Sequence, residues 1–208
     1  MSGGRFVTLE GIEGAGKSTI AKFALAWLTR RGIPGRLTRE PGGTPLAERV
    51  RQIVLERGAE TLSPVAETLL MFAARELHLK NVIRPALERG EWVICDRFTD
   101  ATRAYQGSGR GVDAQLIETL AAAVHPDLAP DCTLLLDLPV PLGLGRARAR
   151  EAGAADRFEA ETVAFFERVR AGYLELARRD PRRFQVLDAA APLAAVEERV
   201  ERALEALA

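Results

Sequence analysis

The amino-acid sequence predicts an α/β protein, a three-layer sandwich in which helices cover both faces of a parallel sheet of five strands. Short apolar runs alternate along the chain with longer helical patterns, as they do in parallel α/β sheets. The runs at 92–96 and 132–137 are almost continuously apolar, which is typical of strands that are buried on both faces. Residues 6–19 contain a strand, a glycine-rich loop and the start of a helix in direct succession.

Each strand and helix follows from a local pattern. The predicted strands are 5–10, 36–38, 92–96, 132–137 and 184–188. Helical periodicity predicts helices at 18–31, 46–57, 64–89, 113–124, 142–150, 159–179 and 192–207. Thr44 and Pro45 are typical of a helix N-cap and first turn, and Gly32 is typical of a helix end. The glycine-rich stretch 106–111 follows no clear strand, and we expect a flexible connector there.

Length and composition predict one domain over 1–208 in a cytoplasmic protein. The 29 basic residues equal the 29 acidic residues, so the overall charge attracts neither nucleic acid nor a membrane surface. The chain has no apolar run of membrane-spanning length, and its start lacks the apolar core of a signal peptide. Cys95 and Cys132 lie in apolar runs, which favours reduced core cysteines.

The loop after the first strand has the spacing of a phosphate-binding P-loop, with Gly11 followed by Gly16, Lys17 and Ser18. Glycines let successive backbone N–H groups turn toward an anion, and the following helix adds its positive N-terminal end. In this context Lys17 would contact the outer phosphates of a nucleotide, and Ser18 would bind Mg²⁺. We expect the phosphates to contact Gly11, Ile12, Glu13, Gly14, Ala15, Gly16, Lys17, Ser18 and Thr19.

Glu13 is unusual in such a loop, because bound phosphates repel a carboxylate. Its side chain either points into solvent or accepts a hydrogen bond from a neutral group. A sugar hydroxyl of a second substrate would suit the second arrangement.

Other charged residues stand where predicted strands end, which is where ligands bind in parallel α/β sheets. Arg39 follows the second strand, so it is either a phosphate contact or a surface arginine. Asp96 and Arg97 follow the third strand. They form either a structural ion pair or a site in which Asp96 holds Mg²⁺ and Arg97 contacts a phosphate.

Two helices carry further candidates. Phe72 and Arg75 lie about one turn apart, so they could contact a base together, although an apolar stripe of this kind is more often core. Residues 143–157 combine arginines with small residues, as in a mobile lid. Arg146 and Arg150 share a helix face there and could reach one phosphate chain, unless this is a solvated basic face.

Taken in order, these segments resemble the bacterial thymidylate kinase family over nearly the whole chain. The resemblance rests on the P-loop at 10–18, Thr-Arg-Glu-Pro-Gly-Gly-Thr at 38–44, Phe-Ala-Ala-Arg at 72–75, Asp-Arg-Phe at 96–98, Thr102 with Tyr105 and Gln106, and the arginines at 146–150. The segments at 38–44 and 96–106 are far more specific to the family than the P-loop.

The resemblance implies transfer of the γ-phosphoryl group of Mg·ATP to dTMP by a homodimer with a five-stranded parallel sheet. It implies catalytic roles for Lys17, Arg97, Arg146 and Arg150, and Mg²⁺ contacts from Ser18 and Asp96. It implies dTMP contacts from Glu13, Arg39, Pro41, Arg51, Phe72, Arg75, Arg97, Thr102, Tyr105 and Gln106. In many relatives the aromatic residue stands four positions before the arginine, where this chain has Met71, so either Met71 or Phe72 could face the base.

Two other functions remain open from the sequence. One is a P-loop kinase for another nucleoside monophosphate or metabolite. The other is a nucleotide-hydrolysing switch, although the chain lacks the Asn-Lys-x-Asp motif with which guanine-nucleotide switches read their base.

Overall fold

The computed structural model describes residues 3–56, 61–150, 157–158 and 161–208 of the chain. Five strands form one sheet in the order β2-β3-β1-β4-β5, and every pairing is parallel. They are β1 (Phe6–Glu10), β2 (Gly35–Arg39), β3 (Trp92–Asp96), β4 (Cys132–Asp137) and β5 (Phe184–Asp188). The predicted parallel sheet of five strands is therefore confirmed, with β1 and its loop at the centre.

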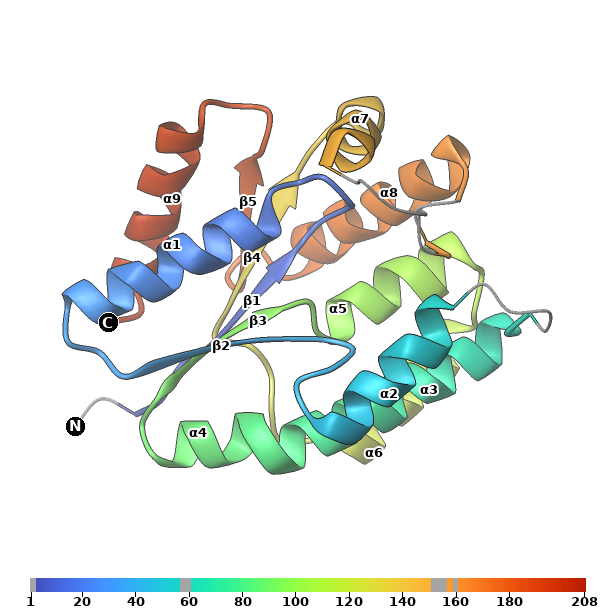
Figure 1. The fold of residues 1–208 in the computed structure, drawn as a ribbon, viewed down its shortest axis with the longest axis horizontal. Helices are drawn as coiled ribbons and strands as arrows, with labels where there is room; N and C mark the ends of the chain where they lie inside the picture. The colour runs from blue at the N-terminus through green and yellow to red at the C-terminus, as the bar shows by residue number, and fades with distance from the viewer. Residues whose placement is uncertain (1–2, 57–60, 151–156, 159–160) are drawn as a thin grey trace.

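Helices cover both faces of this sheet (Figure 1). They are α1 (Lys17–Arg30), α2 (Pro45–Leu55), α3 (Pro64–His78), α4 (Arg84–Glu88), α5 (Thr99–Thr102), α6 (Ala114–Val124), α7 (Val140–Arg150), α8 (Val163–Arg179) and α9 (Leu193–Glu205). Two π-helical segments, η1 (Leu79–Ile83) and η2 (Arg103–Gly109), continue α3 and α5. None of the helices in the described part of the chain is long and apolar enough to cross a membrane.

The alternation of side chains along β1 shows how the three layers form. Val7 and Leu9 pack into a core beneath α1 and α9, which lie side by side (Figure 1). Phe6 points to the opposite face and packs against η1 and α4. Because successive side chains of a strand point to opposite faces, one apolar strand serves two cores. A third apolar cluster lies beneath α8, against β4 and β5.

Two segments differ from the sequence-based expectation. The helix predicted at 64–89 is divided into α3, η1 and α4, because Pro85 lacks the N–H that would continue the α-helical pattern. The connector predicted at 106–111 is wrong for 106–109, which belongs to η2. Gly109 is buried against α8, where a Cβ would lie only 2.7 Å from the Phe165 ring. This glycine serves close packing and not flexibility.

Some predicted boundaries lie outside the described residues. This holds for residue 57 at the end of the predicted helix 46–57, and for residue 159 at the start of the predicted helix 159–179. The described part of the latter begins at Val163, after Thr162, whose side chain accepts a hydrogen bond from the Phe165 amide.

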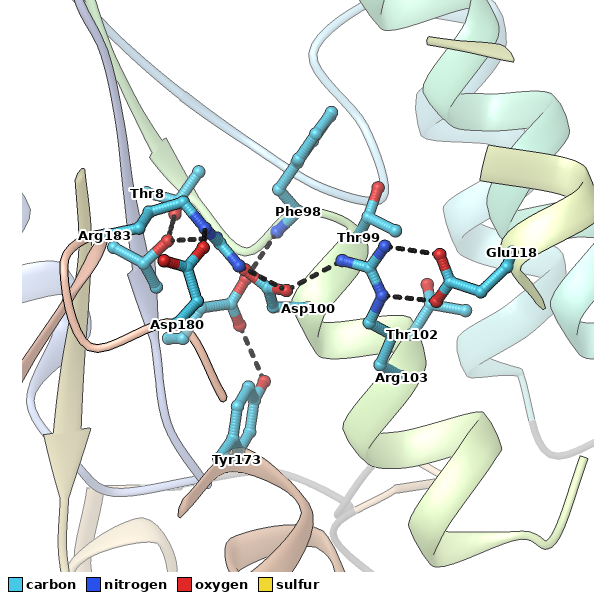
Figure 2. Close-up of polar contacts among 12 residues, drawn as sticks. Thr8, Phe98, Thr99, Asp100, Thr102, Arg103, Glu118, Tyr173, Asp180 and Arg183 are labelled. Atoms are coloured by element: carbon cyan, nitrogen blue, oxygen red, sulfur yellow. Dashed lines mark hydrogen bonds and ion pairs between the residues drawn. The ribbon is translucent and has the colours of Figure 1, made fainter. Parts of the chain in front are cut away.

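A buried network of charged side chains fastens the sheet to α5 and α6 (Figure 2). Asp100 is only 1% exposed, and it accepts hydrogen bonds from Arg183 at 2.5 Å and from Arg103 at 2.9 Å. Arg183 also donates to Thr133 of β4, while Arg103 donates two hydrogen bonds to Glu118 of α6. Buried charges are tolerated only when they are paired in this way, so removing one partner strongly destabilises the folded protein.

We expect Arg183→Leu to lower the free energy of unfolding by about 3 kcal/mol, because it removes one of the two arginines that pair with the buried Asp100 carboxylate. Urea denaturation followed by circular dichroism measures the change. Arg182→Leu is the matched control, because Arg182 is exposed beside it. Equal effects of the two substitutions would contradict a special role for the network.

Candidate active site

A cavity lies at the carboxyl ends of β1, β2 and β3, where the sheet topology predicts a ligand site. Most of the predicted site residues line it: Glu13, Gly14, Ala15, Gly16, Lys17, Ser18, Arg39, Pro41, Arg51, Arg75, Asp96, Arg97, Thr102, Tyr105 and Gln106. Gly11, Ile12, Thr19, Phe72 and Arg146 are not part of this lining.

The loop between β1 and α1 has the backbone that an anion site requires. Gly16 precedes the first turn of α1 with a φ of 92°, a left-handed conformation that glycine adopts without strain. The Thr19 and Ile20 amides donate to the Gly16 carbonyl oxygen at 3.0 and 3.2 Å, whereas the Lys17 and Ser18 amides have no backbone partner among the described residues, so these two are available to an anion. The Lys17 ammonium donates to the carbonyl oxygens of Gly11 at 3.1 Å and Ile12 at 3.0 Å.

Gly14 is required for a different reason, which is its contact with α7. A Cβ at Gly14 would lie 2.0 Å from the carbonyl oxygen of Gly143, and one at Gly143 would lie 2.7 Å from that of Glu13. The loop therefore packs backbone to backbone against the first turns of α7.

The pKa of Lys17 is lowered to about 8, mainly by burial and to a smaller extent by the nearby Arg97 guanidinium. The side chain still faces the cavity. A negatively charged ligand beside it would favour the protonated form.

Ser18 and Asp96 form a suitable site for a divalent cation. Ser18 is exposed to the cavity at the start of α1, and Asp96 ends β3. The Oδ1 atom of Asp96 is buried and has no hydrogen-bond partner among the described residues. A buried carboxylate oxygen without a partner fits a site that binds Mg²⁺ directly or through water.

Arg97 occupies the centre of the site in an uncommon backbone conformation, with a φ of 71°. Its guanidinium donates to Glu13 at 3.0 Å, to the Tyr105 hydroxyl at 2.9 Å and to the Tyr173 hydroxyl at 3.1 Å. Tyr105 in turn donates to the Glu13 carboxylate. Glu13 therefore does not point freely into solvent, and it faces Arg97 and Tyr105 inside the cavity.

Glu10, at the end of β1, supports this arrangement from beneath, and the sequence analysis did not identify it as a site residue. It is fully buried and accepts hydrogen bonds from the Phe98 amide at 2.8 Å and the Tyr173 hydroxyl at 2.7 Å. Burial, with a smaller contribution from the Asp100 carboxylate, raises the pKa of Glu10 to about 8.

Arg75 of α3 forms the far wall of the cavity. It is 3% exposed, and it donates to Glu40 at 2.7 Å, to Thr102 at 3.1 Å and to the Phe98 carbonyl oxygen at 3.2 Å. Glu40 also contacts His78, which is fully buried. The remaining nitrogen of Arg75 is buried without a partner in the described part of the chain. Arg75 also lines the cavity, so this donor lies next to the space that a ligand would occupy.

The structure distinguishes between the two residues that could face a base. Met71 lines the cavity, whereas Phe72 is 2% exposed and packs against Val112, Ile117 and Ala121 in the core. Met71 and Phe72 stand about 40° and about 60° to opposite sides of Arg75 on the helix, so both are its neighbours, and the Arg75 guanidinium lies over the Phe72 ring at 4.6 Å. The geometry therefore favours Met71 over Phe72 as the cavity residue.

The two arginines near the mouth of the cavity come from β2 and α2. Arg39 is exposed and pairs with Glu48 at 2.8 Å. Arg51 donates to the Pro41 carbonyl oxygen at 3.1 Å. Both side chains can approach an anion that enters between the loop after β2 and α2.

Gln106 is held by an ionic cluster beneath the cavity. Its side-chain amide donates to Glu67 at 2.7 Å, and Glu67 is also paired with Arg110 and Arg157. Phe158, next to Arg157, lines the cavity and packs edge to face on Tyr105, with ring centroids 5.9 Å apart. No sequence pattern indicated Phe158, because its position depends on the ion pair between the adjacent Arg157 and Glu67.

Of the predicted lid arginines, Arg146 is not brought to the P-loop. Arg146 is exposed and donates to the carbonyl oxygen of Ala189, after β5, at 2.9 Å. Gly143, Leu144 and Ala147 form the buried side of α7, so Arg146 faces the β5 loop and not the cavity. The side chain of Arg150 and residues 151–156 of the predicted lid lie outside the described residues.

Comparison with known proteins agrees with this geometry. The family model described as thymidylate kinase matches residues 9–200. The thymidylate kinase of Pseudomonas savastanoi pv. phaseolicola is 55% identical over 204 residues, which are 98% of this chain and 96% of the relative. That of Alkalilimnicola ehrlichii is 54% identical over 207 residues, covering 98% of this chain and 94% of the relative. The crystal structure of thymidylate kinase from Ehrlichia chaffeensis superposes with a TM-score of 0.78 at 32% identity, covering 99% of this chain and all of that one. With its P-loop, its cavity lined by arginines and this match over nearly its full length, the chain belongs to the thymidylate kinase family.

Proposed function

We propose that the chain transfers the γ-phosphoryl group of Mg·ATP to dTMP, giving dTDP and ADP. The observation that carries this function is that one cavity joins a P-loop to Arg75, a buried arginine with an unpartnered donor. In the reaction, a phosphate oxygen of dTMP forms a bond to the γ-phosphorus, and the bond from that phosphorus to the β,γ-bridging oxygen breaks. The transferring group carries spread negative charge, so positioning and positive donors supply most of the catalysis.

On the donor side, the amides of the first turn of α1 and the Lys17 ammonium bind the ATP phosphates. Ser18 and Asp96 hold Mg²⁺, which neutralises negative charge on the phosphates when it is bound. Arg146 takes a role at the donor nucleotide beside the loop after β5, because its guanidinium reaches Ala189. Arg150 keeps the proposed role of a lid arginine over the phosphates.

On the acceptor side, Arg97, Arg39 and Arg51 surround the dTMP phosphate. The free nitrogen of Arg75 donates to the edge of the base, and Met71 and Phe158 provide apolar contacts. Glu13 accepts a hydrogen bond from the sugar, and Tyr105 limits the space beside it. Thr102 and Gln106 act mainly by fixing Arg75 and the cavity wall, since both are engaged in hydrogen bonds within the protein.

A homodimer is also part of this proposal. Large apolar side chains are exposed on α2 and α3, which pack against each other: Leu46, Ile53, Val65 and Leu69. The spacings of seven residues in α2 and four in α3 put each pair on one face of its helix. Exposed apolar faces of this kind are typical of contacts between subunits.

Reduced thiols at Cys95 and Cys132, both free and buried, favour a cytoplasmic location.

Ile53→Glu combined with Leu69→Glu is expected to convert the dimer to a monomer, because both substitutions place charges in the proposed interface. Light scattering after gel filtration should change from twice 22.6 kDa to 22.6 kDa. Leu193→Glu is the matched control, since Leu193 is equally exposed but lies on α9. A wild-type monomer would contradict this part of the proposal.

Steady-state rates with different acceptors test the activity itself. We expect dTMP to have the highest kcat/KM among dTMP, dUMP, UMP, CMP and shikimate. The lost methyl group should cost dUMP about tenfold. Comparable turnover of another acceptor would favour a different kinase, and ATP consumption that dTMP does not accelerate would favour a hydrolysing switch.

The pH dependence of kcat/KM for ATP tests the role of Lys17. This parameter reports groups of the free enzyme, so it should fall above pH 8 as Lys17 loses its proton. The corresponding fall in kcat, which forms the basic limb of its pH profile, should occur at higher pH, because bound phosphates favour the charged ammonium of Lys17. In Lys17→Arg the residual activity should lose the limb near pH 8, since a guanidinium stays protonated. A limb that survives in Lys17→Arg would instead belong to Glu10, whose pKa is also about 8.

A further inference from the structure

Arg97 is held from behind by two buried residues that do not line the cavity, Tyr173 and Glu10. The Arg97 guanidinium donates to the Tyr173 hydroxyl at 3.1 Å, and this hydroxyl donates to Glu10 at 2.7 Å. The Tyr173 ring is 1% exposed, and Glu10 is fully buried. The three residues come from α8, from β1 and from the turn after β3, so this contact joins three separate parts of the fold.

Glu10 also fixes the backbone on which Arg97 stands. Its carboxylate accepts hydrogen bonds from the Tyr173 hydroxyl and from the Phe98 amide, two groups that are labelled in Figure 2. The Arg97 amide donates to the Leu9 carbonyl oxygen at 2.9 Å, and the Phe98 amide donates to Glu10 at 2.8 Å. These two bonds secure both peptide groups beside a residue whose φ of 71° is uncommon for any side chain with a Cβ.

On its cavity side, the same guanidinium donates to Glu13 and Tyr105. If the Glu13 carboxylate were its only partner, the Arg97 guanidinium would move together with the Glu13 side chain. The contact with Tyr173 is made by the other terminal nitrogen, so the guanidinium is held by three acceptors, Tyr173, Glu13 and Tyr105. An arginine fixed in this way loses less conformational entropy when it binds a phosphate.

We propose that Tyr173 and Glu10 are positioning residues, which hold the Arg97 guanidinium where the acceptor phosphate meets the transferring phosphoryl group. This role rests on the proposed function. Neither residue touches substrate, so both act through Arg97.

Tyr173→Phe tests the role by removing one hydroxyl while keeping the ring that packs against Tyr105, with centroids 6.2 Å apart. We expect kcat to fall about tenfold and KM for dTMP to rise severalfold, because Arg97 loses an acceptor that holds its charge in place. KM for ATP should stay within about twofold of wild type, since the P-loop contacts are unchanged. Glu10→Gln should give the same pattern, because an amide cannot reproduce both acceptor contacts.

Thr133→Val is the matched control for loss of a buried hydroxyl. Thr133 is fully buried and belongs to the Arg183 side of the network, with no hydrogen bond to Arg97 among those in the described residues. It should leave the kinetics with dTMP unchanged, even where it lowers the melting temperature.

A double-mutant cycle with Arg97→Lys separates positioning from a general structural effect. If the Tyr173 hydroxyl acts through the guanidinium, Tyr173→Phe should change kcat by less than about twofold in the Arg97→Lys background. A full tenfold loss in both backgrounds, or no loss in the wild-type background, would overturn the inference. Absence of dTMP turnover by the wild-type protein would contradict the proposed function first, so the two failures are distinguishable.

Discussion

The guanidinium of Arg97 donates hydrogen bonds to Tyr173, Tyr105 and Glu13, and so joins α8, η2 and the P-loop at one point. The geometry of the cavity depends on this contact, because Glu13 belongs to the P-loop while Tyr105 belongs to η2 on the opposite wall. Glu10 completes the connection by binding both Tyr173 and the backbone next to Arg97. The P-loop therefore contributes a side chain as well as its backbone to the cavity, since its carboxylate is held by Arg97 and Tyr105.

Buried ion pairs surround the cavity on the acceptor side. Arg75 is paired with Glu40, and the fully buried Glu67 accepts from Arg110 and Arg157. Pairs of this kind contribute little net stability, because the cost of removing the charges from water is large. Their benefit to the protein is that each arginine is fixed in one direction before substrate binds. Arg75 illustrates this, since three contacts hold it while one buried nitrogen stays available.

The donor side is built by close backbone contact. Gly14 and Gly143 bring the P-loop and α7 together at a distance that no side chain would allow. This contact determines which side of α7 faces the loop. The buried side of the helix faces the loop through Gly143, and Arg146 is directed instead to the carbonyl oxygen of Ala189 after β5. The spacing of arginines in the sequence shows which of them share a helix face. It does not show which part of the protein that face contacts, so the contact of Arg146 with Ala189 could not be predicted from it.

The sequence by itself determined the five strands, their parallel arrangement, the P-loop with Lys17 and Ser18, and most of the residues that line the cavity. The strands and the P-loop follow from apolar periodicity and local spacing along the chain, whereas Pro41, Arg51, Thr102, Tyr105 and Gln106 were expected only from the resemblance to the family. Only the tertiary structure decided that Met71 and not Phe72 lines the cavity, that residues 106–109 are a packed helix, and that Glu10, Tyr173 and Phe158 support the site. Tyr173 meets Glu10 across 163 residues of chain, so their contact follows from how α8 packs on the sheet and leaves no local pattern in the sequence.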